Sequence, residues 1–134
     1  MASLENEIKV MRLLDHQNVL KLREVYETKN SYYMVVDMLK GGNLLDLIQN
    51  KTLNNFNVVS ILLGLIRAVE YIHSLGIMHR DIKPENIYFD QMDRIKLGEF
   101  GHAIDATRHK PVSKVGTLEF MAPEVLDVER HARG

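Results

Sequence analysis

The stretch that decides the fold of this chain is His79-Arg80-Asp81-Ile82-Lys83-Pro84-Glu85-Asn86. It is dense in charge and lies between two apolar segments of different character. Before it, apolar periodicity predicts a long helix over 54–75, with Gly76 in the position of a helix-terminating glycine. After it, 87–89 and 94–97 have the composition of short strands. A charged segment in this place is either an exposed surface loop or a site of chemistry.

The rest of the chain predicts a mixture of helices and strands. An amphipathic helix is expected over 4–14, strands over 19–26 and 32–36, and a short helix over 43–50. The long helix has an apolar row formed by Val58, Leu62, Leu65, Val69 and Ile72. The breadth of its apolar surface predicts burial on more than one side.

Composition limits the functional classes. The chain has 134 residues, 46% hydrophobic and 26% charged, which predicts one globular domain. A net charge of −1 provides no basic surface for nucleic acid or an acidic membrane. Cysteine is absent, and the six histidines include no i, i+4 pair, so neither disulfides nor a histidine metal site is expected. The N-terminus does not resemble a signal peptide, and the apolar run 58–66 is too short to span a bilayer. We therefore expect an intracellular, cytoplasmic protein without nucleic-acid or membrane partners.

The opening stretch resembles the catalytic loop of protein kinases, H-R-D-x-x-x-x-N. This resemblance implies that Asp81 accepts the proton of a substrate hydroxyl and that Asn86 binds Mg²⁺ through its amide oxygen. It also implies that Lys83 lies near the transferred phosphate, as in serine/threonine kinases. Arg80 is typical of kinases whose activation loop is ordered by a phosphate, and Ser113 lies where such a phosphosite falls. Ile104 stands where many of these kinases have a basic partner for that phosphate.

Further kinase motifs follow in order. The segment 95–101 resembles the D-F-G segment, with Glu99 in place of Asp, so Asn86 and Glu99 are the implied metal ligands. The segment 116–124 resembles the P+1 loop and A-P-E motif, which implies that Thr117 lies against the catalytic loop. Upstream, Glu7 corresponds to the glutamate of the αC helix, which pairs with a lysine in the family.

The segment 33–42 resembles the strand and hinge that hold the adenine of ATP. The residues implied in nucleotide binding are Val36 as gatekeeper, Asp37 and Met38 through their main chain, Asn43 and Leu44 after the hinge, Tyr88 beneath the adenine ring, and Glu7. The resemblance also implies a hydrophobic spine of Met11, Leu22, His79 and Phe100. The sequences Glu24-Val25-Tyr26-Glu27 and Lys40-Gly41-Gly42-Asn43 are similar to those of calcium/calmodulin-dependent kinases.

The implied fold is α+β, a partial protein kinase fold. Residues 1–37 would be a remnant of the N-lobe, 38–42 the hinge, and 43–134 the first part of the C-lobe. The six residues before Glu7 cannot supply the Gly-rich loop and the β3 lysine, and the chain stops ten residues after Glu124. We therefore expect a domain truncated at both ends, of marginal stability unless a partner protein or missing chain segments cover its exposed core.

Two functional hypotheses follow. The first is a serine/threonine kinase that uses ATP and Mg²⁺ to phosphorylate protein substrates in the complete domain, with no activity in residues 1–134 alone. The alternative is a non-catalytic kinase-like module that binds a protein partner. A nucleotide-binding module without phosphate transfer is a third, weaker hypothesis, because the phosphate-cradling glycine loop is missing.

Overall fold

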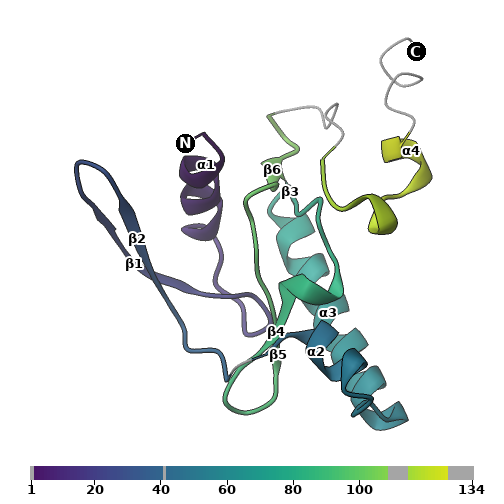
Figure 1. The fold of residues 1–134 in the computed structure, drawn as a ribbon. Coiled ribbons are helices and arrows are strands. Elements are labelled where there is room, and N and C mark those ends of the chain that lie inside the picture. The colour runs from purple at the N-terminus through teal and green to yellow at the C-terminus, as the bar shows by residue number, and fades with distance from the viewer. Residues whose placement is uncertain (1, 41, 109–114, 127–134) are drawn as a thin grey trace.

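The computed structural model describes residues 2–40, 42–108 and 115–126. A helix and a β-hairpin lie on one side, and a long helix with two shorter ones lies on the other (Figure 1). Six short strands pair as three antiparallel two-stranded sheets, β1–β2, β3–β6 and β4–β5. The elements in chain order are α1 (Ala2–Met11), β1 (Leu22–Glu27), β2 (Tyr32–Val36), α2 (Leu44–Gln49), α3 (Asn55–Ser74), β3 (Ile77–Met78), a 3₁₀ turn (Pro84–Asn86), β4 (Ile87–Phe89), β5 (Ile95–Leu97), β6 (Ile104–Asp105), a second 3₁₀ turn (Leu118–Phe120) and α4 (Pro123–Leu126). The predicted α+β fold class is confirmed.

The N-terminal helix and hairpin form as predicted, with shifted boundaries. Helix α1 ends at Met11 rather than at residue 14, and Ile8, Met11 and Leu14, which follows the helix, are buried. Strand β1 begins at Leu22 rather than at residue 19. The reason is that Val19 makes an isolated parallel bridge to Leu97 instead of joining the hairpin.

Side-chain caps fix the ends of the next two helices. Asn43 caps α2 by accepting a hydrogen bond from the Asp46 N–H at 3.1 Å, while the Asp46 carboxylate accepts from the Asn43 N–H at 2.8 Å. Asn54 caps α3 by accepting one hydrogen bond, from the Asn57 N–H at 2.9 Å. Gly76, with φ of +75°, follows the end of α3. The predicted bounds of both helices are therefore confirmed.

The predicted apolar row of α3 is buried only in part. The buried residues of this helix are Ile61, Gly64, Ala68 and Ile72, whereas Val58 is 40% and Leu62 51% exposed. Gly64 explains the shift, because a Cβ there would lie 2.5 Å from Cγ1 of Ile95. The helix therefore turns its smallest residues towards β5. The predicted burial on more than one side is absent from the described residues.

The length and composition of helix α3 bear on whether the chain contains a segment able to span a membrane. Its 20 residues are long and apolar enough to cross a membrane by length and composition, with a mean hydropathy of 1.4. The core helix of a soluble protein meets the same criterion, and one row of α3 packs against β5. The length of this helix corrects the expectation, based on the interrupted run 58–66, that nothing in the chain could span a bilayer.

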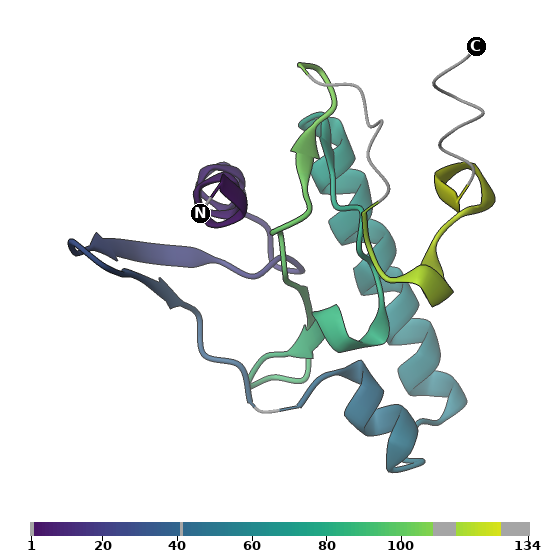
Figure 2. The ribbon, with the colours of Figure 1, turned by 45° about the horizontal axis from the view of Figure 1, so that its top comes forward.

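A single buried cluster joins the two sides of the molecule. The segment after α1 is fixed to β5 by two main-chain hydrogen bonds, Leu20 N to Leu97 O at 2.9 Å and Leu97 N to Asn18 O at 2.8 Å. Figure 2 shows this segment reaching the β4–β5 hairpin between α1 and α3. The four expected spine residues are all buried, at 2, 8, 1 and 0% exposure for Met11, Leu22, His79 and Phe100. The division into 1–37, 38–42 and 43–134 stays a prediction.

Candidate active site

The loop after β3 is organised around His79. Its side chain is 1% exposed, and burial lowers the pKa of its imidazole, which favours the neutral form. Nδ1 accepts a hydrogen bond from the Asp81 N–H at 3.1 Å, so the proton resides on Nε2, which donates to the Gly98 carbonyl at 2.7 Å. The ring also meets Phe100 edge-on, with 5.0 Å between centroids. Through these contacts His79 holds the loop against the segment that carries Glu99.

Asp81 lies at the centre of a hydrogen-bond network. Its side chain is buried, and Oδ1 accepts from both the N–H (3.0 Å) and the hydroxyl (2.8 Å) of Thr117. The Thr117 hydroxyl in turn accepts from the Lys83 ammonium. Lys83 Nζ lies 3.8 Å from Asp81 Oδ2. The structure therefore brings together a carboxylate, a hydroxyl and a cation from segments 36 residues apart.

Asn86 completes the loop. Its amide nitrogen donates to the main-chain oxygen of Asp81 at 2.8 Å and more weakly to Oδ2 at 3.3 Å. The amide is thereby oriented with its nitrogen towards Asp81, which leaves its oxygen as a possible metal ligand. Pro84 begins the 3₁₀ turn that ends at Asn86, which fixes this position on the chain.

Gly116 allows the Thr117 segment to approach the loop. Its φ is +112°, and a Cβ at this position would lie 2.5 Å from the carbonyl oxygen of Arg80. Only glycine provides this combination of conformation and space. The contact between Thr117 and Asp81 depends on this approach.

Two carboxylates, those of Glu7 and Glu99, lie near enough beside the loop for their charges to interact. Burial, and secondly the charge of Glu99, raise the pKa of Glu7, while the Phe100 N–H and His102 act in the opposite direction. Burial followed by the charges of Glu99 and Glu7 also raises the pKa of the Tyr88 phenol. No ion pair of the described residues involves Glu7 or Glu99. Such a pair of like charges is suited to a cation, since a positive charge would relieve the repulsion.

The donor set fits Mg²⁺ in its chemistry. Asn86 and Glu99 offer an amide oxygen and a carboxylate, and oxygen ligands are those that Mg²⁺ prefers. Glu99 is exposed and has φ of +61°, a conformation that is uncommon outside glycine, asparagine and aspartate. Within the described residues, no three His, Asp or Glu side chains gather as a protein-only metal site. A metal here would therefore need further ligands from water or substrate.

The residues expected to bind nucleotide differ in exposure. Val36 is 37% and Met38 73% exposed, whereas Leu44 and Tyr88 are half-buried. Asp37 forms a bidentate pair with Arg23, at 2.5 and 3.0 Å, which the sequence did not indicate.

The contact of Asn43 with a nucleotide stays a prediction. Its side-chain oxygen accepts the hydrogen bond that caps α2. Its main chain forms an antiparallel bridge with Tyr88. Asn43 therefore joins the start of α2 to β4. Its spacing from Asp46 was the signal for a capping box.

Of the two residues in the regulatory prediction, the structure describes only Arg80. Arg80 has φ of +70°, and its Nε donates to the His102 carbonyl at 2.6 Å. Burial lowers the pKa of this guanidinium. Ser113 lies outside the described residues, so its pairing with Arg80 stays a prediction.

Comparisons with known proteins identify the family. The protein kinase domain family matches residues 2–134. The chain is 40% identical over 129 residues to a probable serine/threonine-protein kinase pXi of Dictyostelium discoideum, covering 92% of this chain and 19% of that protein. It is 35% identical over 128 residues to calcium/calmodulin-dependent protein kinase type 1 of Macrobrachium nipponense, covering 92% and 37%. It is 38% identical over 130 residues to CBL-interacting protein kinase 28 of Oryza sativa subsp. japonica, covering 94% and 30%.

The chain therefore belongs to the protein kinase family, among relatives of the serine/threonine type, and the resemblance stated from its motifs is confirmed. The family uses ATP and Mg²⁺ in general. The chain spans between about a fifth and slightly over a third of the length of these curated relatives.

Proposed function

We propose that this chain carries the catalytic loop of a serine/threonine protein kinase that, in its full-length form, transfers the γ-phosphate of ATP to serine or threonine hydroxyls of protein substrates. The observation that carries the proposal is the Lys83–Thr117–Asp81 network, in which a carboxylate and an ammonium share one hydroxyl. The lysine two residues after the aspartate favours a serine/threonine rather than a tyrosine substrate.

Asp81 is held in one orientation for its proposed role as acceptor of the substrate proton. Both Thr117 donors bind Oδ1, which leaves Oδ2 towards Lys83 and Asn86. A carboxylate fixed in this manner can receive a proton from a hydroxyl placed beside Oδ2. Lys83 lies on the same side, where its charge would stabilise the transferred phosphate.

The nucleotide and its metal would lie along the side of the hinge segment and Tyr88. Bound Mg²⁺ neutralises charge on the phosphates and supplies electrostatic stabilisation of the transfer. Asn86 and Glu99 would hold this metal, Glu7 would pair with a lysine ammonium, and Val36, Asp37, Met38, Leu44 and Tyr88 would contact the nucleotide. The half-buried Tyr88 ring offers an aromatic face for stacking against adenine.

The experiment is a phosphotransfer assay of the full-length protein with serine-, threonine- and tyrosine-containing peptides. Asp81→Asn is expected to lower kcat by at least ~10²-fold while nucleotide affinity is retained, because the acceptor of the proton is lost. Asp15→Asn is the matched control, since that side chain is 85% exposed and distant from the loop. Equal activity of Asp81→Asn and wild type, or exclusive use of tyrosine, would contradict the proposal.

The polypeptide of residues 1–134 by itself is proposed to have no phosphotransfer activity, since no G-x-G-x-x-G sequence occurs in it to cover the phosphates. Transfer by the isolated polypeptide that disappears in Asp81→Asn would contradict this statement.

The second candidate function is a non-catalytic module that binds a protein partner. The observation in its favour is the exposed apolar surface of α3, where Phe56 is 81%, Ile66 61% and Val59 57% exposed. Wild-type full-length protein that binds a partner but transfers no phosphate in the assay above would favour this candidate.

A further inference from the structure

A groove separates α3 from the turn between β4 and β5, on the far side of that hairpin from the catalytic loop. It has a volume of about 840 Å³. In β4–β5, Phe89 pairs with Ile95 and Tyr88 pairs with Lys96. Because neighbouring residues of a strand face opposite sides, Phe89 and Ile95 line the groove while Tyr88 faces the carboxylates of the active site. The groove is therefore a separate surface from the proposed nucleotide site.

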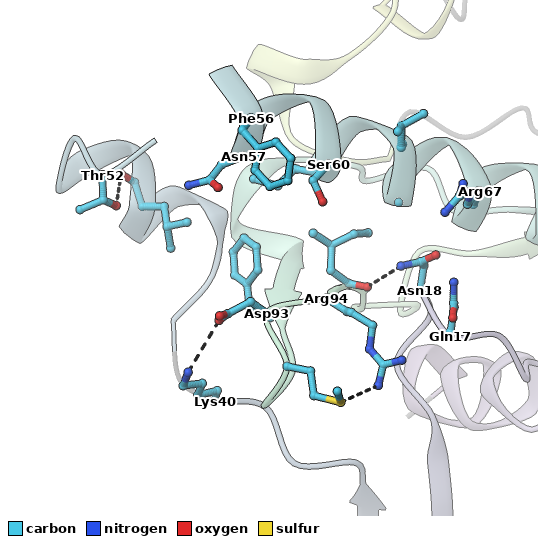
Figure 3. Close-up of a pocket in the computed structure, with 17 residues that line it drawn as sticks. Gln17, Asn18, Lys40, Thr52, Phe56, Asn57, Ser60, Arg67, Asp93 and Arg94 are labelled. Atoms are coloured by element: carbon cyan, nitrogen blue, oxygen red, sulfur yellow. Dashed lines mark hydrogen bonds and ion pairs between the residues drawn. The ribbon is translucent and has the colours of Figure 1, made fainter. Parts of the chain in front are cut away.

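The groove has an apolar floor and an apolar rim. Ile61, Phe89 and Ile95 are buried and form part of its lining. At the rim, Phe56 is 81% and Met92 72% exposed. Figure 3 shows the Phe56 ring on α3 above the groove. Exposed apolar side chains beside a hollow are typical of protein-binding surfaces.

The charged side chains along the groove are mostly basic. Lys40, Arg67 and Arg94 line it together with one acidic residue, Asp93. Lys40 lies 3.7 Å from Asp93, and Arg94 pairs with Asp90 at 3.2 Å. Arg67 has no ion pair within the described part of the chain. The chain as a whole has a net charge of −1, so this positive surface is a local feature.

The inner end of the groove also presents an unsatisfied acceptor. Oδ1 of Asn18 is buried and has no hydrogen-bond partner among the described residues, while its amide nitrogen donates to the Ile95 carbonyl at 3.1 Å. Figure 3 places Asn18 and Arg67 at the same end of the groove. A buried acceptor without a partner is unfavourable, and a donor entering the groove would satisfy it.

We propose that this groove binds an extended segment of a partner protein in which apolar residues alternate with aspartate or glutamate. The apolar residues would pack between Phe56 and Met92, and the acidic ones would face Arg67, Lys40 and Arg94. A main-chain N–H of the segment would supply the donor for Asn18. A small molecule fits less well, because small-molecule sites enclose most of their ligand and this rim is exposed.

The probe is a short labelled peptide in which leucine alternates with glutamate, titrated against the full-length protein by fluorescence anisotropy. We expect saturable binding that weakens with added salt, and no binding of a peptide in which lysine replaces glutamate. Arg67→Glu should weaken binding of the glutamate peptide by about tenfold or more. Met92→Ser should weaken it independently, because it removes apolar contact without changing charge.

Arg12→Glu is the matched control, since it makes the same change of charge at an exposed position directly after α1, outside the groove. Thermal unfolding of each variant establishes that it is folded. Absence of binding, or an equal loss in Arg12→Glu and Arg67→Glu, would overturn the proposal. If the protein self-associates in the absence of peptide, and Met92→Ser abolishes this self-association, the proposal is overturned. The occupant of the groove would then be a second copy of the chain.

Discussion

Thr117 shows how a single hydroxyl connects two charged groups. It accepts from Lys83 and donates to Asp81, so it stabilises both side chains in one geometry. A side chain of the same shape without a hydroxyl would leave Oδ1 of Asp81 with one donor fewer, the Thr117 N–H alone. The effect should therefore fall on turnover rather than on nucleotide binding.

The first prediction concerns Thr117 in the full-length protein. Thr117→Val should lower kcat by about tenfold to 10²-fold, with the affinity for ATP unchanged, because the orientation of Asp81 is lost. Thr117→Ser retains the hydroxyl and should recover most of the activity. Steady-state kinetics and nucleotide titration measure the two effects, and wild-type turnover in Thr117→Val would contradict the proposed network.

The second prediction concerns Glu99, which stands where the family has aspartate. Glu99→Asp should preserve or raise activity, because the shorter side chain moves its oxygens by ~1 Å and aspartate tolerates the positive φ of +61° better than glutamate. Glu99→Gln removes the charge and should weaken Mg²⁺ binding, which calorimetry of the nucleotide complex would measure. A large loss of activity in Glu99→Asp would mean that the metal site is built around the longer side chain.

The third prediction follows from the buried neutral imidazole of His79. Its pKa in the folded state lies below the ordinary value of 6.5, so the unfolded state binds a proton first as the pH falls. The contribution of this group to stability is therefore present above about pH 6.5 and is lost progressively below it. Urea unfolding of wild type should show a steeper loss of stability below this pH than unfolding of His79→Phe.

His73→Phe is the control for this prediction, because it removes an exposed histidine from a nearby stretch of the chain. Its slope should equal that of wild type. The comparison uses slopes rather than absolute stabilities, since His79→Phe also removes the hydrogen bond to Gly98. If the slope for His79→Phe were identical to that of wild type, the prediction that His79 causes the loss of stability below this pH would be contradicted.

At the scale of the element, the contact between α3 and β5 depends on Gly64. Alanine is normally preferred to glycine inside a helix by about 1 kcal/mol. At this position, however, the added Cβ would lie 2.5 Å from Ile95 Cγ1 and 3.2 Å from Asn18 Nδ2. Ile95 is 2% exposed and has little room to move.

The fourth prediction is therefore that Gly64→Ala destabilises the protein in spite of its better helix propensity. Overpacking of a core typically costs about 1–3 kcal/mol, which exceeds the gain in propensity. Ser60→Ala, on the exposed side of the same helix, should change stability by less than about 0.5 kcal/mol. Chemical unfolding of both variants measures the difference in the free energy of unfolding. If Gly64→Ala were more stable than wild type, α3 and β5 would be able to move apart without a loss of free energy.

At the scale of the whole molecule, the main feature is the apolar surface that the described residues leave exposed. Leu62, Leu63 and Ile66 are 51, 48 and 61% exposed along α3. Exposed apolar side chains in such number on one helix are typical of a surface that is covered in the functional state. The exposure agrees with the expectation that a partner or further chain covers this side.

The fifth prediction is that the polypeptide of residues 1–134, expressed by itself, self-associates through α3. Replacing Leu62 and Ile66 with glutamine should shift it towards the monomer in sedimentation velocity, because the apolar area that drives association is reduced. Arg12→Glu, outside this surface, should leave the distribution unchanged. Binding of the wild-type polypeptide to lipid vesicles, lost in the same double variant, would instead assign α3 to a membrane.

The sequence by itself determined the elements whose signals are local. The end of α3 at its glycine and the charged stretch 79–86 are defined by residues within a few positions of one another, whereas the equally local cap at Asn43 was not predicted. The spacing of Asp81, Lys83 and Asn86 likewise predicted their proximity, and motif resemblance extended this prediction to Thr117.

Only the tertiary structure decided which groups from distant segments meet. The buried row of α3 follows from the close approach of Ile95 to Gly64, and no periodicity within the helix could select it among several apolar rows. The proximity of Glu7, Glu99 and Tyr88, and the groove beneath α3, arise in the same way from segments far apart in the chain. Long-range packing sets these contacts because burial depends on the shape of the facing surface, which a local pattern does not contain.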